Sequence, residues 1–218
     1  MFNYNNKIKQ FLIFGHSYKK SVKFILTLSK DLEEILIGLM LGDLFAEKLK
    51  PNSNTRLQPG FKQPGSNKNK EYIHHLYSLF KDYCGSEPKI TSSFDNRSNK
   101  QSYNISIKFW TFSLPCFNKF RDIFYRDGVK YIPSNLEDLI TALAYWAMDD
   151  GYKFGNGFYF CTESYSFDDN IKLKDILKNK FNLDSGVHKH TNGFRLYIFS
   201  SSKDNLISLI KPFLITLL

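Results

Sequence analysis

Cysteine is scarce in this chain, and its placement excludes two common ways of stabilising a fold. The 218 residues include only Cys84, Cys116 and Cys161, which lie far apart and form no Cys-X-X-Cys pair. No cysteine and histidine residues have the spacing of a zinc ligand set, so we expect neither a structural zinc site nor a disulfide framework. The sequence also lacks a run of about 18 apolar residues, and we therefore expect no membrane contact.

Arginine is scarce as well, although the chain is strongly basic. The net charge is +9, and lysine supplies 25 of the 30 positive charges while arginine supplies 5. Lys, Asn, Ile, Phe and Tyr together make up 95 of the 218 residues, a bias that A+T-rich codons produce in many organellar genomes. We therefore expect an organellar protein, mitochondrial first and chloroplast as the alternative. The same bias weakens each lysine as an argument for nucleic-acid binding.

The positive charge is unevenly distributed. Residues 1–30 carry six lysines and no acidic residue, residues 31–133 have a net charge of +4, and residues 134–218 have a net charge of −1. The first segment contains no arginine, few serines and no evident cleavage signal, which favours a basic N-terminal arm over a transit peptide. We expect a polyanion to contact this arm and residues 31–133 more heavily than residues 134–218.

Residues 31–133 contain an order of predicted elements that later recurs. An apolar helix ends at Gly42, and it is followed by a hairpin, an amphipathic helix, a second hairpin and a closing helix. In the return strand of the second hairpin, alternation predicts that Tyr103, Ile105, Ile107 and Phe109 point inward.

Residues 134–218 repeat this order. A helix with an N-cap at Ser134 ends at residues 149–151, and hairpins turn at residues 155–157 and at Asn192-Gly193. Each half thus reads αββαββα, so we expect an α+β fold of two pseudo-symmetric halves. Each half would have one four-stranded antiparallel sheet, and neither could bury both faces of its sheet alone, so we expect a shared interface.

Two carboxylates occupy equivalent places in these halves. Asp43 and Asp150 each lie at the C-terminal end of an apolar helix, where the negative end of the helix dipole disfavours a carboxylate. Each one alone is an ordinary helix terminus. If the two helices pack about a pseudo-two-fold axis, however, the carboxylates converge, and a divalent metal ion would neutralise them.

The same helices carry a family resemblance. Residues 36–44 (LIGLMLGDL) and 143–151 (LAYWAMDDG) resemble the two copies of the LAGLIDADG motif of single-chain homing endonucleases, and the second has a form typical of intron-encoded members. Residues 61–63 (FKQ), 129–133 (VKYIP) and 209–215 (LIKPFLI) also resemble segments of that family. The resemblance implies saddle-shaped sheets, joined through the two motif helices in a monomer.

The resemblance further implies an activity and its residues. Asp43 and Asp150 would be catalytic and would bind Mg²⁺, with Mn²⁺ as a substitute. Lys130 would stabilise a phosphate or relay a proton, and Gln63 and Glu163 would organise water around the metal ions. The expected reaction is a double-strand break in a long, pseudo-asymmetric DNA target, leaving short 3′ overhangs.

Recognition would come from alternate side chains on the exposed faces of the two sheets, which would lie along the major groove. His74 and His75 are expected to be structural. The residues expected to contact DNA are Arg56, Lys62, Arg97, Lys100, Lys108, Lys153, His188, Lys189, His190 and Arg195.

Some residues depart from the family pattern. Leu41 stands where the consensus has its first Asp, and Tyr145 replaces a packing Gly. Lys130 has no evident symmetric partner in the second half, where Lys203 and Lys211 are the nearest substitutes. The alternative functions are therefore an intron-splicing maturase that binds its host intron RNA, and a strand-biased nickase or DNA-binding protein with impaired catalysis.

The charge distribution generates a prediction. Removal of residues 1–30 should weaken DNA binding and flatten its dependence on salt, because each lost phosphate contact lowers the slope of log K against log salt by about 0.9. Binding measured over a range of KCl concentrations checks this, and an unchanged slope would exclude the arm from DNA contact.

Overall fold

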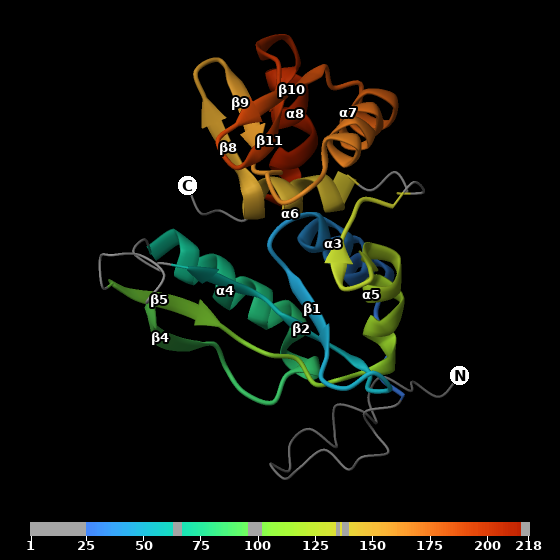
Figure 1. Ribbon diagram of the computed structural model, residues 1–218, viewed down its shortest axis with the longest axis vertical. Helices are drawn as coiled ribbons and strands as arrows, with labels where there is room; N and C mark the ends of the chain where they lie inside the picture. Colours follow the sequence, from blue (N-terminus) through green and yellow to red (C-terminus); the bar gives the residue numbers. More distant parts are fainter. Residues whose placement is uncertain (1–24, 63–66, 96–101, 134–135, 137–139, 215–218) are drawn as a thin grey trace.

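Two helices lie side by side at the centre of the structure, between two lobes (Figure 1). They are α3 (Lys30–Leu41) and α6 (Ile140–Asp150), the helices that carry the two motifs. The computed structural model describes residues 25–62, 67–95, 102–133, 136 and 140–214. One lobe contains α3 and the elements up to Lys130, and the other contains α6 and the elements that follow it.

The packing of α3 against α6 depends on a close backbone approach. A Cβ atom on Gly38 would lie 2.3 Å from the carbonyl oxygen of Ala142, so no other residue fits there without moving a helix. Buried Leu36, Leu39 and Met40 fill the first lobe side of the interface, and Trp146 stacks on Phe160 to fix α6 to the second sheet. Side chains from both halves therefore form one continuous core.

The first lobe follows the expected order. Ile73, Leu76 and Phe80 are buried on α4, as the spacing predicts. Its further elements are β1 (Phe45–Lys48), β2 (Thr55–Gln58), β3 (Gly60–Lys62), α4 (Asn67–Phe80), β4 (Lys89–Asp95), β5 (Ser102–Lys108), α5 (Asn118–Phe124), β6 (Tyr125–Arg126) and β7 (Val129–Lys130).

The sheet of the first lobe is divided. Strands β1 and β2 pair with each other, and β3, β5 and β4 form a separate three-stranded sheet in that order. Pro59 lies between β2 and β3, and it has no N–H to donate to a neighbouring strand. Its carbonyl oxygen accepts a hydrogen bond from Phe109 at 3.2 Å, which keeps the two sheets adjacent.

One expectation for β5 is wrong. Ile107 and Phe109 are buried as alternation predicts, but 45 % of Ile105 is exposed. Ile105 lies opposite Ser92 on β4, and the exposed Phe94 lies farther along the same strand. The core therefore ends before it reaches the distal part of this hairpin. The side chain of Tyr103 is outside the described residues.

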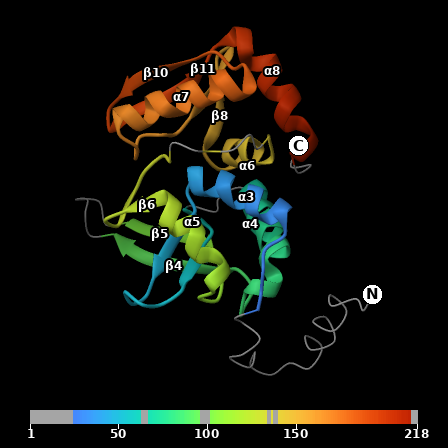
Figure 2. The same cartoon turned by 90° about the vertical axis from the view of Figure 1, so that its right-hand side faces the viewer.

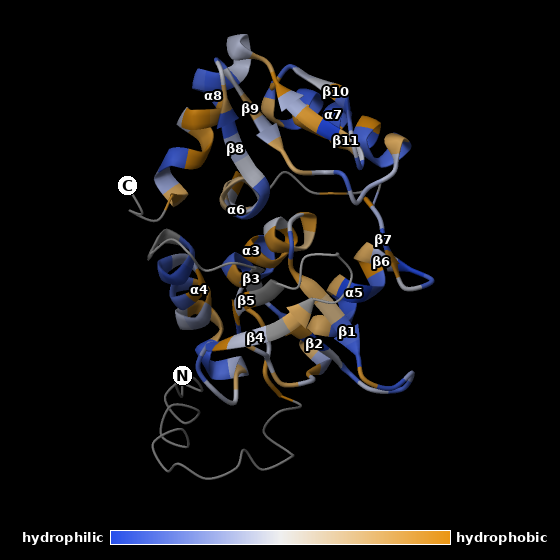
Figure 3. Cartoon of the chain, turned by 60° about the vertical axis from the view of Figure 1, so that its left-hand side comes forward, coloured by the Kyte–Doolittle hydropathy of each residue, from blue (hydrophilic) through white to orange (hydrophobic). Residues whose placement is uncertain are grey.

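The second lobe has the expected four-stranded antiparallel sheet, with the strand order β10-β11-β9-β8. Helices α7 and α8 pack on one face of this sheet (Figure 2). Apolar and polar residues alternate around α8, where Leu206 and Ile210 are buried and Ile207 is exposed (Figure 3). The elements are β8 (Gly151–Phe154), β9 (Gly157–Phe160), α7 (Phe167–Phe181), β10 (Ser185–His190), β11 (Gly193–Ile198) and α8 (Ser200–Ile210). Ser134 lies outside the described residues.

The start of the first motif helix refines the boundary of the N-terminal arm. Ser29 is the N-cap of α3, where its hydroxyl accepts the Leu32 N–H at 3.3 Å, and Leu26 and Leu28 pack against the core. A deletion of residues 1–30 would remove these contacts along with the lysines. The salt-dependence experiment is therefore best made with residues 1–24 deleted. Among the described helices, none has the length and apolarity needed to cross a membrane.

Candidate active site

The C-terminal ends of α3 and α6 open into one cleft. Asp43, Asp149 and Asp150 line it, together with Gly151, Tyr152, Cys161, Glu163 and Ser164, and its volume is about 420 Å³. The structure thus brings together Asp43 and Asp150, which are 107 residues apart in the sequence. Their convergence is the geometry that the paired helix ends predict.

Asp149 is a third acid that the sequence reasoning did not select. Its Oδ2 accepts a hydrogen bond from the backbone N–H of Asp43 at 2.6 Å, across the interface between the halves. A Cβ on Gly42 would lie 2.2 Å from the same oxygen, so the first motif needs glycine where the second has Asp149. The sequence signal for this difference between the two motifs is the pair of aspartates at 149–150, which aligns with Gly42-Asp43 in the first motif.

Lys130 lies at the end of α3, as its place in the linker implies. The β6–β7 hairpin turns through Asp127 and Gly128, which both have positive φ, and carries Lys130 back to the end of α3. Its Nζ donates to the carbonyl oxygens of Gly42 at 2.5 Å and Leu44 at 3.2 Å. These bonds place its charge next to the backbone of Asp43.

Tyr165, from the second half, completes the end of α3. Its hydroxyl donates to the carbonyl oxygens of Leu41 at 2.9 Å and Met40 at 3.3 Å. These carbonyls come from the last turn of the helix, where intrahelical donors run out. The position of Asp43 is therefore fixed by three groups outside the first motif: Asp149, Lys130 and Tyr165.

The acids of the cleft are held close together: Asp149 and Asp150 are half-buried, and Asp43 is exposed. Burial, followed by repulsion from Asp43, raises the pKa of Asp149 to about 7. Burial, followed by repulsion from Asp149 and Asp43, raises the pKa of Asp150 to about 8. Burial also lowers the pKa of Lys130 to about 8, although the three aspartates oppose this change. The cleft therefore favours a cation that offsets the clustered negative charge.

The donors of the cleft suit a hard divalent cation. Among the described residues, no three His, Cys, Asp or Glu side chains form a complete metal ligand set. Asp43 and Asp150 do offer two carboxylates to the same cleft, and Mg²⁺ is commonly held by one or two carboxylates with substrate phosphates and water as its other ligands. The carboxylate oxygens of Asp43 and Asp150 therefore suit a Mg²⁺ ion whose other ligands are water and a substrate phosphate.

The match to known proteins follows this geometry. A model of the LAGLIDADG DNA endonuclease family matches residues 33–206. The chain belongs to this family. It is 31% identical over 201 residues to the cytochrome b mRNA maturase bI2 of Debaryomyces hansenii, which covers 89% of this chain and 74% of the relative. It is also 29% identical to the DNA endonuclease I-ChuI of Chlamydomonas applanata, covering 87% of this chain and 93% of the relative.

A solved structure supports the fold over nearly the whole length. The homing endonuclease I-WcaI bound to its DNA recognition sequence superimposes with a TM-score of 0.80 at 29% identity, covering 96% of this chain and 94% of that chain. The α+β LAGLIDADG fold expected from the sequence is therefore confirmed.

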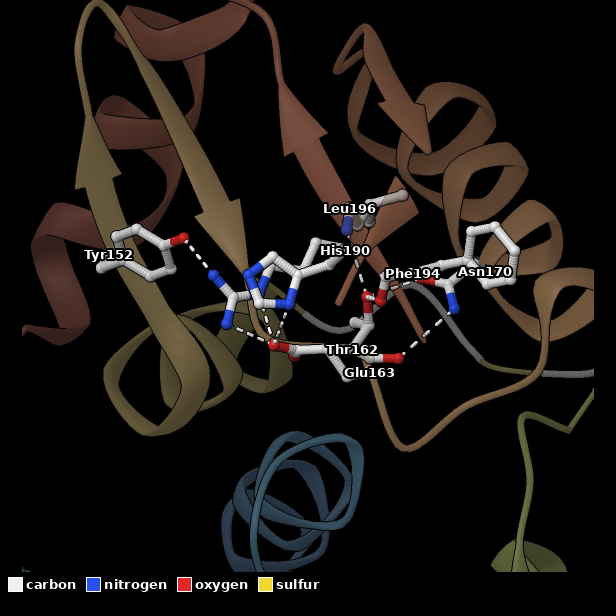
Figure 4. Close-up of polar contacts among 8 residues, drawn as sticks. Tyr152, Thr162, Glu163, Asn170, His190, Phe194 and Leu196 are labelled. Atoms are coloured by element: carbon white, nitrogen blue, oxygen red, sulfur yellow. Dashed lines mark hydrogen bonds and ion pairs between the residues drawn. The ribbon is translucent and has the colours of Figure 1, made fainter. Parts of the chain in front are cut away.

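Glu163 stands at the edge of the LAGLIDADG cleft and holds two of the predicted DNA-contact residues (Figure 4). It forms an ion pair with Arg195, and His190 Nδ1 lies 3.6 Å from the same carboxylate oxygen. Arg195 also donates to the hydroxyl of Tyr152 at 2.7 Å. Arg195 is thus held in place by Glu163 and Tyr152.

In the first lobe, the structure describes only part of the predicted contact set. Arg56 pairs with Glu47 and lies 3.8 Å above the ring of Trp110. Lys108 lies directly opposite Lys89 on the neighbouring strand, which leaves two like charges side by side. Gln63, Arg97 and Lys100 lie outside the described residues, as does the side chain of Lys62.

In the second lobe, the strand register separates the predicted contacts into two groups. His188 lies opposite Arg195, on the face of the sheet that α7 and α8 leave open. Lys153 lies opposite Phe158, and Lys189 opposite Phe194, which contacts Phe167 of α7. The two lysines therefore lie on the helix-covered side, although both are exposed there.

The other residues considered from the sequence lie outside the cleft. His75 Nε2 lies 2.9 Å from the hydroxyl of Tyr145, which joins α4 to α6 and agrees with a structural role, while His74 is exposed. Lys203 on α8 and exposed Lys211 beyond it do not line the cleft.

The clustered acids generate a prediction for the metal-free protein. Ca²⁺ or Mg²⁺ should raise the melting temperature of the wild-type protein, because the ion removes repulsion among the clustered carboxylates. Asp150→Asn should raise the melting temperature without metal and should largely abolish the gain with Ca²⁺. Differential scanning calorimetry with and without Ca²⁺ measures both effects, and Asp168→Asn, on the exposed first turn of α7, is the matched control. An equal Ca²⁺ gain in all three proteins would contradict the metal site.

Proposed function

We propose that this LAGLIDADG protein is a Mg²⁺-dependent, site-specific endonuclease that cuts both strands of a long, pseudo-asymmetric DNA target and leaves short 3′ overhangs. The observation that carries the proposal is the convergence of Asp43 and Asp150 in one cleft, with Lys130 beside it. The relatives named as DNA endonucleases and the DNA-bound I-WcaI structure support DNA as the substrate. The internal pseudo-symmetry supports a monomer, because the chain supplies both halves of the site.

Asp43 and Asp150 would hold the metal ions, which stabilise developing negative charge on phosphate oxygens and promote ionisation of a bound water. The residues of the chain supply the rest of the arrangement. Asp149 and Tyr165 fix the end of α3, so that Asp43 does not have to reorganise when substrate binds.

Lys130 has the features of an electrostatic stabiliser. Its bonds to the carbonyl oxygens of Gly42 and Leu44 hold the ammonium group beside the backbone of Asp43, where it would approach a phosphate bound at that carboxylate. Its lowered pKa, caused by burial, also suits a group that gives or takes a proton near neutral pH. Glu163, which lines the cleft from the second lobe, holds Arg195, so the two strands of a bound duplex would meet different cationic side chains.

The proposal predicts a loss of chemistry without a loss of binding. Asp43→Asn should abolish cleavage of the intron-less insertion site in Mg²⁺ while binding in Ca²⁺ persists. Lys130→Met should slow cleavage by about 10²–10³-fold, as removal of one electrostatic stabiliser does elsewhere. Single-turnover cleavage of a labelled duplex measures the rate, with Lys174→Met, on α7 and away from the cleft, as the matched control. Wild-type protein that fails to cut in both Mg²⁺ and Mn²⁺ would overturn the proposal.

A supercoiled plasmid carrying the insertion site distinguishes a nuclease that cuts both strands from a strand-biased nickase. Linear product is the expected end point. Accumulation of open circles without linear product would favour a nickase. That outcome is expected if cleavage of each strand needs its own lysine, because Lys130 has no symmetric counterpart in the second half.

A second function is favoured by relatives that bear one name, cytochrome b mRNA maturase bI2. Its name connects the family to splicing of an organellar message, and with the codon bias it supports a mitochondrial origin for this chain. If this protein assists splicing, self-splicing of its host intron at low Mg²⁺ should accelerate when the protein is added. Asp43→Asn should accelerate it equally, since splicing assistance does not need the DNA-cleavage chemistry. An unchanged splicing rate would exclude the maturase function.

A further inference from the structure

Six aromatic side chains cover the open face of the second-lobe sheet. Cross-strand pairing places Tyr152 opposite Tyr159 and Tyr159 opposite Tyr197, so rings from three adjacent strands lie on one side. His188 on β10 extends this row to the fourth strand. The aromatic face consists of Tyr152, Phe154, Tyr159, His188, Tyr197 and Phe199.

The rings of the aromatic face hold one another in place. Tyr159 is central, with ring centroids 4.7 Å from Tyr197, 5.4 Å from Phe154 and 5.6 Å from Tyr152. Its hydroxyl is hydrogen-bonded to His188 Nδ1 at 2.8 Å. A Cβ on Gly157 would lie 2.2 Å from the Tyr197 hydroxyl, so glycine is required where that ring crosses β9. These contacts lower the entropy lost when a ligand binds to the face.

The aromatic face is poor in free positive charge. Among its described neighbours, Arg195 is paired with Glu163, and Lys153 and Lys189 lie on the helix-covered side. The open face of the first-lobe sheet differs, since Lys89 and Lys108 stand side by side there. Phosphate binding therefore suits the first lobe, and contact with bases suits the second.

The aromatic face is continuous with the cleft. Tyr152 belongs to the face and also lines the cleft with Asp43 and Asp150. A duplex whose phosphates reach the two aspartates therefore passes over this face. In the major groove, the C5 methyl group of thymine is the apolar group that a base pair presents to such a surface.

We infer that the aromatic face recognises thymine methyl groups in one half of the target site, an inference that rests on the proposed function. Phe154 is the more exposed of the two phenylalanine rings on this face, with 58 % of its surface exposed beside the β8–β9 turn. Apolar contact with the methyl groups would fix which T·A pairs are accepted in that half, while the basic face of the first lobe supplies more of the phosphate contacts.

Selection of duplexes from a randomised library by the wild-type protein in Ca²⁺ provides the target for a test. One half of the selected site should be enriched in T·A pairs. Uracil is then substituted for thymine in each half separately, which removes the methyl group and keeps every hydrogen-bonding group. Binding should weaken about fourfold for each contacted thymine in the enriched half, the value expected for one buried methyl group, and should change little in the other half.

Phe154→Ala should lose much of this sensitivity to uracil. Phe167→Ala is the matched control, because Phe167 is 47 % exposed on the helix-covered side of the same lobe and should keep it. Thermal unfolding of both variants verifies that they fold. Uracil that has no effect, or an equal effect on wild type and Phe154→Ala, would overturn the inference.

The outcomes separate the inference from the proposed function. A selected site that is cut in Mg²⁺ but is insensitive to uracil would overturn the inference alone. A selected site that is sensitive to uracil as expected but is not cut in Mg²⁺ or Mn²⁺ would overturn the nuclease and support the aromatic face. Failure to select any site would overturn both.

Discussion

The backbone contact between Gly38 and Ala142 is the constraint on which the rest of the structure depends. Because α3 and α6 touch at this point, their C-terminal ends lie close enough for Asp149 to accept the Asp43 N–H at 2.6 Å. Any larger residue at 38 would separate the helices and, with them, the carboxylates. The chemistry of the cleft is therefore a consequence of how two helices pack, since neither half could assemble it alone.

The pseudo-symmetry of the two halves is broken at the site itself. The first motif ends in Gly42-Asp43 and the second in Asp149-Asp150, so the second motif supplies a half-buried acid that occupies the space left by the glycine. Lys130 lies on the carbonyls that flank Asp43, while the Glu163–Arg195 pair lies near the other end. Two carboxylates at equivalent positions, Asp43 and Asp150, thus lie in two different electrostatic surroundings.

Local pattern was sufficient for most of the elements and for the convergence of Asp43 and Asp150 in one cleft. Asp43 and Asp150 follow apolar helices in two similar segments, and this information is contained within each segment. Asp149 could not be assigned in this way, because its role depends on contact with Gly42 from the other half. Ile105 shows the same limit, since alternation predicts an inward side chain but cannot say where the core ends along a hairpin.

The faces of β8 show how a local rule can mislead at a binding surface. Lys153 alternates with Tyr152 and Phe154, a pattern that normally predicts inward aromatic residues and an outward lysine. The register reverses this, because Phe158, opposite Lys153, and Phe160 face the core, whereas Tyr159 stands opposite Tyr152 on the open side. Exposed aromatic rings keep apolar surface in contact with water, so this surface does not contribute to the stability of the fold. An exposed apolar patch of this kind is typical of a binding surface. A ligand that covers the aromatic face would explain why this apolar surface lies next to the acidic cleft. The packing of α3 against α6 fixes the position of the cleft and therefore the position of that ligand.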